Sequence, residues 1–183
     1  MVETITMESQ ESSTELGVEQ APPSPASAAQ SPELRRDVER LGETLLARVS
    51  DVLELTMTRT EGLHLDADLR SSAERISKTS TLALGRWLAG EESRVAREAS
   101  AETWLFYGEL AASRTATLSD VITHCMCWRD AVSEVLEQSA AQLQLNPEAL
   151  SQARHMLRLG LELGFIQMSQ AFDSAQKHSL ARP

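Results

Sequence analysis

A histidine and two cysteines lie close together in one segment of the sequence, at His124, Cys125 and Cys127. Imidazole and thiolate groups are common ligands of structural zinc. The segment is predicted to be helical, and because successive helical positions differ by about 100°, His124 and Cys125 cannot face the same ion. His124 and Cys127 could share a face, with His155 from the next helix as a further ligand, but a closed zinc site needs four. We therefore predict no metal site, a buried Cys125, and a His124 that is exposed or at the rim of a pocket.

A catalytic cysteine or a haem site would need further groups that this sequence does not supply. A nucleophilic cysteine needs a neighbour that stabilises the thiolate, and it needs an oxyanion hole. The sequence arranges neither. Haem needs an axial ligand such as histidine, and the four histidines lie in no recognisable haem-attachment motif. We therefore predict no catalytic residue and no cofactor.

Most of the large aromatic side chains, together with two arginines, have two possible roles. As buried anchors they would fill the core or an interface, because aromatic rings dominate burial in a helical bundle. As a ligand site they would line a pocket between helices, with the arginines holding an anionic group. We prefer the first interpretation. The residues of this candidate ligand pocket or interaction surface are Trp87, Trp104, Tyr107, Arg114, His124, Trp128 and Arg129.

Amphipathic helices must position these residues. Apolar residues recur at the three- and four-residue spacing of a helix face, and aromatics make up only 4% of the chain. Ser31 followed by Pro32 is a helix-start signal, and Asn146 followed by Pro147 repeats it. We predict an all-α fold, an antiparallel bundle of about five helices. Their expected ranges are 31–59, 66–89, 92–113, 117–145 and 146–176.

Local signals refine three of these helices. Gly90 fits a left-handed helix end, and Thr117 with Asp120 forms a variant of the capping box. Gly160 and Gly164 lie four apart in the last helix, where each costs about 1 kcal/mol relative to alanine. We interpret them as a flat strip for close helix packing, with a cavity beside the strip as the alternative. The inward face of the 92–113 helix is predicted to hold Val95, Ala99, Thr103, Phe106, Leu110 and Ser113.

Charge and composition exclude several functions. The chain has 183 residues and a net charge of −10, and without a basic stripe we expect no direct nucleic-acid binding. No apolar run is long enough to span a membrane, and the acidic, polar N-terminus does not resemble a secretory signal. Cys125 and Cys127 cannot pair with each other on a helix. Two free thiols indicate a cytoplasmic location.

The chain divides into three predicted parts. Residues 1–30 are rich in Ser, Glu and Pro and hold no Lys or Arg, so they lack the apolar surface that would offset the entropy of ordering. We predict a disordered acidic leader there. Residues 31–177 are predicted to form the helical bundle. Residues 178–183 are expected to be a short tail or the start of a linker.

One resemblance follows from the order of the helices and a dispersed residue pattern. The segments LRSSAERISKTSTLALGRWLAGEE, ELAASRTATLSDVITHCMCWRDAVSEVL and LNPEALSQARHML resemble the helical N-terminal domain of PucR-type transcription regulators and RsbRD-type stress-signalling proteins. The resemblance covers about residues 34 to 173. The matching positions are Arg114, Leu118, Val121, Trp128 and Arg129.

The resemblance implies a regulatory or sensory input module of bacterial signalling without enzymatic activity. Its ligands are not defined, so no binding residue is carried over from it. No output domain follows the bundle in this sequence, so we expect either a stand-alone module or a segment of a longer protein. The expected partner is a second copy or a signalling protein. A small-molecule sensor, less plausibly a haem sensor, is the alternative.

Overall fold

A computed structural model describes residues 31–91, 94–114 and 118–180 of the chain. These residues form helices and no strand, which confirms the all-α prediction. The predicted leader 1–30 and the capping threonine Thr117 lie outside the described residues. The helices are α1 (Pro32–Ala47), α2 (Val49–Arg59), α3 (Ala67–Leu88), α4 (Arg94–Ser113), α5 (Leu118–Leu143) and α6 (Pro147–Leu180).

Local capping signals set most of the helix ends. The Ser31 side chain accepts a hydrogen bond from the backbone N–H of Leu34 at 3.1 Å, at the start of α1. Asn146 accepts one from the N–H of Glu148 at 2.9 Å, at the start of α6. Gly90 has φ +76°, the left-handed conformation predicted for it after α3. These helix ends were therefore predictable from neighbouring residues alone.

The first predicted helix is in fact two helices, which gives six rather than about five. Arg48 leaves the helical conformation, with φ −110° and ψ 22°, and separates α1 from α2. Its guanidinium donates to Asp51 Oδ2 at 2.7 Å, and to Ser139 and Gln138 of α5 at 3.3 and 2.9 Å. The break lets α1 pack on α3 and α6, while α2 packs on α5 and α3. A one-residue break leaves the apolar periodicity intact, so the sequence did not reveal it.

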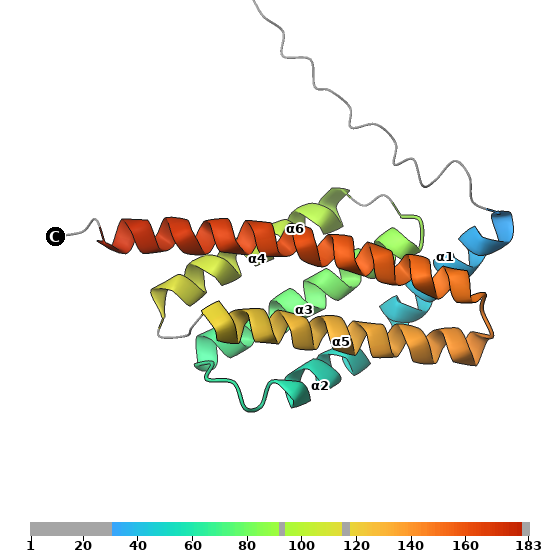
Figure 1. The fold of residues 1–183 in the computed structure, drawn as a ribbon, viewed down its shortest axis with the longest axis horizontal. Helices are drawn as coiled ribbons and strands as arrows, with labels where there is room; N and C mark the ends of the chain where they lie inside the picture. Colours follow the sequence, from blue (N-terminus) through green and yellow to red (C-terminus); the bar gives the residue numbers. More distant parts are fainter. Residues whose placement is uncertain (1–30, 92–93, 115–117, 181–183) are drawn as a thin grey trace, which may run out of the picture. The chain divides into compact units, whose positions relative to one another are not determined.

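Two other helix ends differ from the prediction. α5 ends at Leu143 rather than Leu145, because Gln144 takes a left-handed conformation with φ +53°. α6 continues to Leu180, four residues past the predicted end at 176. Figure 1 shows α6 running alongside α4 and α5.

The inward face predicted for α4 was wrong. Val95 is 73% exposed and Phe106 45% exposed. Trp104, Tyr107 and Ala111 are buried instead. The reason is Gly108, because a Cβ at this position would overlap the backbone carbonyl of Met168 in α6. The missing side chain lets α4 and α6 approach closely and fixes the rotation of α4, and this requirement is invisible in the periodicity of α4 alone.

Several buried hydroxyl groups of the core form hydrogen bonds within their own helices. The side chains of Thr56, Thr60, Thr81 and Ser139 are buried. Each donates a hydrogen bond of 2.6–2.9 Å to the carbonyl oxygen one turn earlier in its own helix. These residues therefore occupy little volume in the core without demanding a partner from another helix.

None of the helices within the described part of the chain combines the length and apolarity that a membrane span requires.

Candidate functional site

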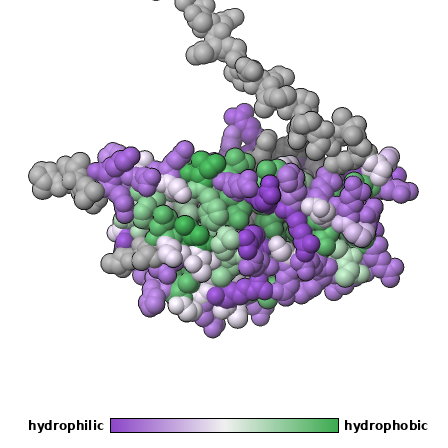
Figure 2. Space-filling view, viewed as in Figure 1, coloured by the Kyte–Doolittle hydropathy of each residue, from purple (hydrophilic) through white to green (hydrophobic). Residues whose placement is uncertain are grey.

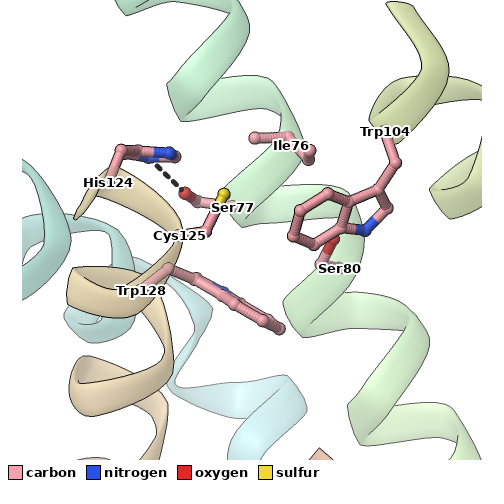
Figure 3. A pocket seen from close by; sticks show the side chains of 7 residues that line it. All are labelled: Ile76, Ser77, Ser80, Trp104, His124, Cys125 and Trp128. Carbon is pink, nitrogen blue, oxygen red and sulfur yellow. Dashed lines mark hydrogen bonds between the residues drawn. The ribbon is translucent and has the colours of Figure 1, made fainter. Parts of the chain in front are cut away.

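The candidate residues meet where α3, α4 and α5 pack together. Figure 3 shows side chains from these three helices converging on one small space. His124, Cys125 and Trp128 come from α5, Trp104 from α4, and Ile76, Ser77 and Ser80 from α3. We call these seven residues the central cluster.

Trp104 fills the middle of the central cluster. Its ring meets the ring of Trp128 edge-on, with centroids 6.3 Å apart, and that of Phe165 in α6 at 6.1 Å. The same ring lies against Gly164, where a Cβ would overlap it. The side chains of the central cluster leave no room for a water molecule between them. The central cluster is therefore packed core in this conformation, as the preferred interpretation of the aromatics predicted.

A chain of hydrogen bonds joins α5 to α3 beside Trp104. The indole N–H of Trp128 donates to the Thr81 hydroxyl at 3.0 Å, and that hydroxyl donates to the Ser77 carbonyl at 2.7 Å. The Ser77 hydroxyl lies 3.2 Å from His124 Nε2. All four side chains are buried. Ser77 and Thr81 lie four apart on α3, so one face of α3 serves both polar groups of α5.

Two buried polar atoms in this region have no hydrogen-bond partner among the described residues, His124 Nδ1 and Tyr107 Oη. The two rings meet edge-on with centroids 5.6 Å apart. Burial lowers the pKa of His124 from its ordinary value of 6.5 to about 4. Burial also raises the pKa of Tyr107, as do the nearby Cys125 and Asp120. His124 is therefore neutral at pH 7 and Tyr107 protonated.

The prediction that His124 is exposed or at a rim was wrong, because the residue is 1% exposed. Burial is tolerated because Ser77 supplies a partner for one ring nitrogen. Cys125 is buried as predicted, and burial raises the pKa of its thiol, which stays protonated at neutral pH. Cys127 points elsewhere, and its Sγ donates to the Arg59 carbonyl at 3.8 Å. Within the described residues, no three His, Cys, Asp or Glu side chains are placed to hold a metal ion.

The remaining predicted site residues do not join the central cluster. Trp87 is 40% exposed at the end of α3. Arg114 forms ion pairs with Asp66 and Asp68, and Arg129 pairs with the adjacent Asp130. Both arginines are therefore occupied at the surface, and the structure does not place either as a clamp for an anion in the central cluster.

Ser77 and Thr81 were not predicted as partners of α5. A serine and a threonine in a helix usually indicate only a small-residue packing face. Their one signal is the four-residue spacing, which matches that of His124 and Trp128 on α5. That match identifies them only once α3 and α5 are known to be neighbours.

No protein-family model matches this chain, and neither a curated protein nor a solved structure is significantly similar to it. The resemblance to signalling input domains therefore rests on the residues quoted above and remains a prediction.

The two glycines of α6 give a matched pair of stability predictions. Gly164→Ala forces a Cβ into the Trp104 ring, and we expect a loss of about 1–3 kcal/mol in the free energy of unfolding. Gly160→Ala meets nothing within 4 Å, and we expect a gain of up to about 1 kcal/mol from helix propensity. Urea unfolding followed by circular dichroism measures both. Equal effects would show that Trp104 does not rest on Gly164.

The burial of His124 makes stability depend on pH. Because its pKa is lowered from 6.5 to about 4, the unfolded chain binds more protons than the folded chain between these values. The contribution of His124 to the free energy of unfolding is therefore fully present above pH 6.5. It falls by about 3 kcal/mol as the pH drops to 4, because protonation of His124 favours the unfolded chain. We expect His124→Gln to lose less stability than the wild type between pH 7 and pH 4.5 in urea titrations. Parallel pH profiles would contradict a buried, neutral His124.

Proposed function

We propose that this chain is a non-enzymatic regulatory input module of bacterial signal transduction, acting through protein–protein contacts on α6. The observation that carries the proposal is an exposed apolar face. Leu163 is 61% exposed and Ile166 54% exposed, and the half-buried Met156 and Leu159 continue the same face. We call these four residues the α6 stripe.

The α6 stripe lies on the side of the helix away from the core. Its members follow three- and four-residue spacing, and so do Leu157, Leu161, Gly164 and Met168, which are buried on the opposite side. Figure 2 shows hydrophobic residues over part of α6 and, next to them, towards the start of α5, with hydrophilic residues over much of the rest of this face. Single exposed apolar residues are common in proteins, whereas contiguous ones mark interaction sites.

Two further points support a binding role over a chemical one. Trp104 fills the central cluster, and the groups there that could act as base or nucleophile, His124 and Cys125, are buried. The resemblance to PucR-type and RsbRD-type input domains implies a module of this kind. The stimulus and the output are then properties of the protein that α6 contacts.

The test is affinity capture in the native host with three forms of the chain. We expect the wild type to capture a signalling protein, such as a transcription regulator or a component of a stress pathway, and Leu163→Glu to lose it. Val95→Glu is the matched control, because Val95 is also exposed and apolar but lies on α4. Circular dichroism checks that each variant keeps its helices. Capture of no signalling protein, or equal capture by all three forms, contradicts the proposed function.

A second candidate function, a small-molecule sensor, is favoured by one observation. His124 Nδ1 and Tyr107 Oη are buried with no hydrogen-bond partner in the part of the chain that the structure describes, and each such group costs about 1–3 kcal/mol. A ligand that supplies hydrogen bonds to them would recover this free energy. Because Trp104 occupies the space beside His124, the ligand would have to displace its ring.

This candidate predicts a ligand-dependent melting temperature. A metabolite that binds here stabilises the wild type by about 2.7 kcal/mol at a concentration of one hundred times its Kd. We expect the shift to be smaller in His124→Gln, and tryptophan fluorescence to change as Trp104 moves. The absence of any shift across a broad metabolite panel would reject the sensor, and a purified protein without a Soret band would reject haem.

A further inference from the structure

The α6 stripe has the spacing of a helix–helix pairing surface. Met156, Leu159, Leu163 and Ile166 are separated by three, four and three residues, which is the heptad pattern of two helices that pack along their length. Gln170, Asp173 and Lys177 continue the spacing towards the end of the helix. The face therefore extends beyond its apolar centre in a single register.

The middle of the stripe coincides with the middle of α6. Leu163 lies sixteen residues after Pro147 and seventeen before Leu180. If two copies of α6 run antiparallel with Leu163 against the partner's Ile166, the helices overlap over nearly their whole length. An offset stripe would leave one end of each helix unpaired. The central position therefore lets a two-fold symmetric contact use nearly the whole of both helices.

The length of α6 gives this contact enough area. Its 34 residues extend about 51 Å, and a strip about 10 Å wide along them covers about 500 Å² on each copy. The pair then buries about 1,000 Å², the lower bound for a specific interface. The exposed apolar residues of α4 form no such continuous strip, because the exposed Glu98 and Glu102 lie between Val95 and Phe106 on the same side of that helix.

Charges at the two ends of the stripe select the antiparallel direction. Glu148 and His155 border it at the N-terminal end, and Asp173 and Lys177 continue it at the C-terminal end, all four exposed. Antiparallel pairing puts Asp173 beside the partner's His155, and Lys177 within about one turn of the partner's Glu148. Parallel pairing would put Glu148, Asp173 and Lys177 each beside its own copy, where like charges repel. Antiparallel helix dipoles also attract.

The centre of the stripe brings little charge into the contact. No charged residue occurs between Leu163 and Phe172. Glu162, which borders the centre, is paired with Arg158 at 3.2 Å. Two chains of net charge −10 can therefore meet here without burying unpaired carboxylates.

From these observations we propose that the α6 stripe binds a second copy of this chain, with the two α6 helices antiparallel about a two-fold axis between Leu163 and Ile166. The proposal rests on the proposed function, because both use the same face of α6, and it identifies the first partner of that face. The pairing of two copies is then the protein–protein contact through which α6 acts.

Sedimentation velocity over a micromolar concentration series tests the pairing. We expect the wild type and Val95→Glu to sediment at twice the mass of one chain, and Leu163→Glu at the mass of one chain. Circular dichroism confirms that the variants are folded. A wild type that stays monomeric, or a dimer that Leu163→Glu leaves intact, overturns the proposal.

Cysteine cross-linking tests the direction of the pairing. In the antiparallel dimer, the double variant His155→Cys/Asp173→Cys forms an intermolecular disulfide under mild oxidation, and each single variant at these positions does not. A parallel dimer gives the reverse, because each single variant would link to its own copy. Peptide mass spectrometry separates these links from any formed by Cys127. Self-linked single variants overturn the proposal.

The two proposals can fail separately. A dimer that captures no signalling protein in the host retains the pairing and rejects the proposed function. A monomer that captures a signalling protein through Leu163 retains the proposed function and rejects the pairing, and it assigns the α6 stripe to a partner of another sequence.

Discussion

The contact of Trp104 with Gly164 holds the C-terminal half of the bundle together. The indole ring occupies the space that a side chain at position 164 would fill, and from there it reaches Trp128 and Phe165. Gly108 lets α4 lie close enough to α6 for this contact to form. Because the ring touches residues of α5 and α6 from its place on α4, it sets how all three helices are rotated. The outward position of the α6 stripe follows from the same constraint.

The parts of the fold that the sequence predicted are those decided by neighbouring residues. Ser31 and Asn146 start helices through hydrogen bonds that span two or three positions, and Gly90 ends one through its own backbone freedom. The break at Arg48 and the rotation of α4 were not predicted. Arg48 is held by Gln138 and Ser139, about ninety residues away. α4 has two competing apolar faces, which the contacts of Gly108 with Met168 and of Trp104 with Gly164 distinguish.

The candidate site shows the same difference between features set by neighbouring residues and features set by residues far away in the sequence. Trp87, Trp104, Tyr107 and Trp128 were predicted as anchors because large aromatic rings dominate burial in a helical bundle. Trp104, Tyr107 and Trp128 are buried, whereas Trp87 is 40% exposed. The burial of His124 depends on the hydroxyl of Ser77 from a helix far away in sequence. Arg114 and Arg129 appeared free to bind an anion, but each finds an aspartate near the surface. The position of a polar side chain depends on its hydrogen-bond or ion-pair partner. When that partner is on another helix, the spacing of residues along one helix does not reveal it.

The self-satisfied hydroxyls of the core bear on how this fold can change during evolution. Thr56 and Thr60 donate only to carbonyls of their own helix, so their exchange for alanine leaves no partner stranded. Such positions can therefore drift independently among Ala, Ser and Thr. Trp104 and Gly164 cannot, because a change in either needs a compensating change in the other. Divergent copies of this bundle would then share a few coupled positions and little else, and the coupled pair would be the mark by which to recognise them.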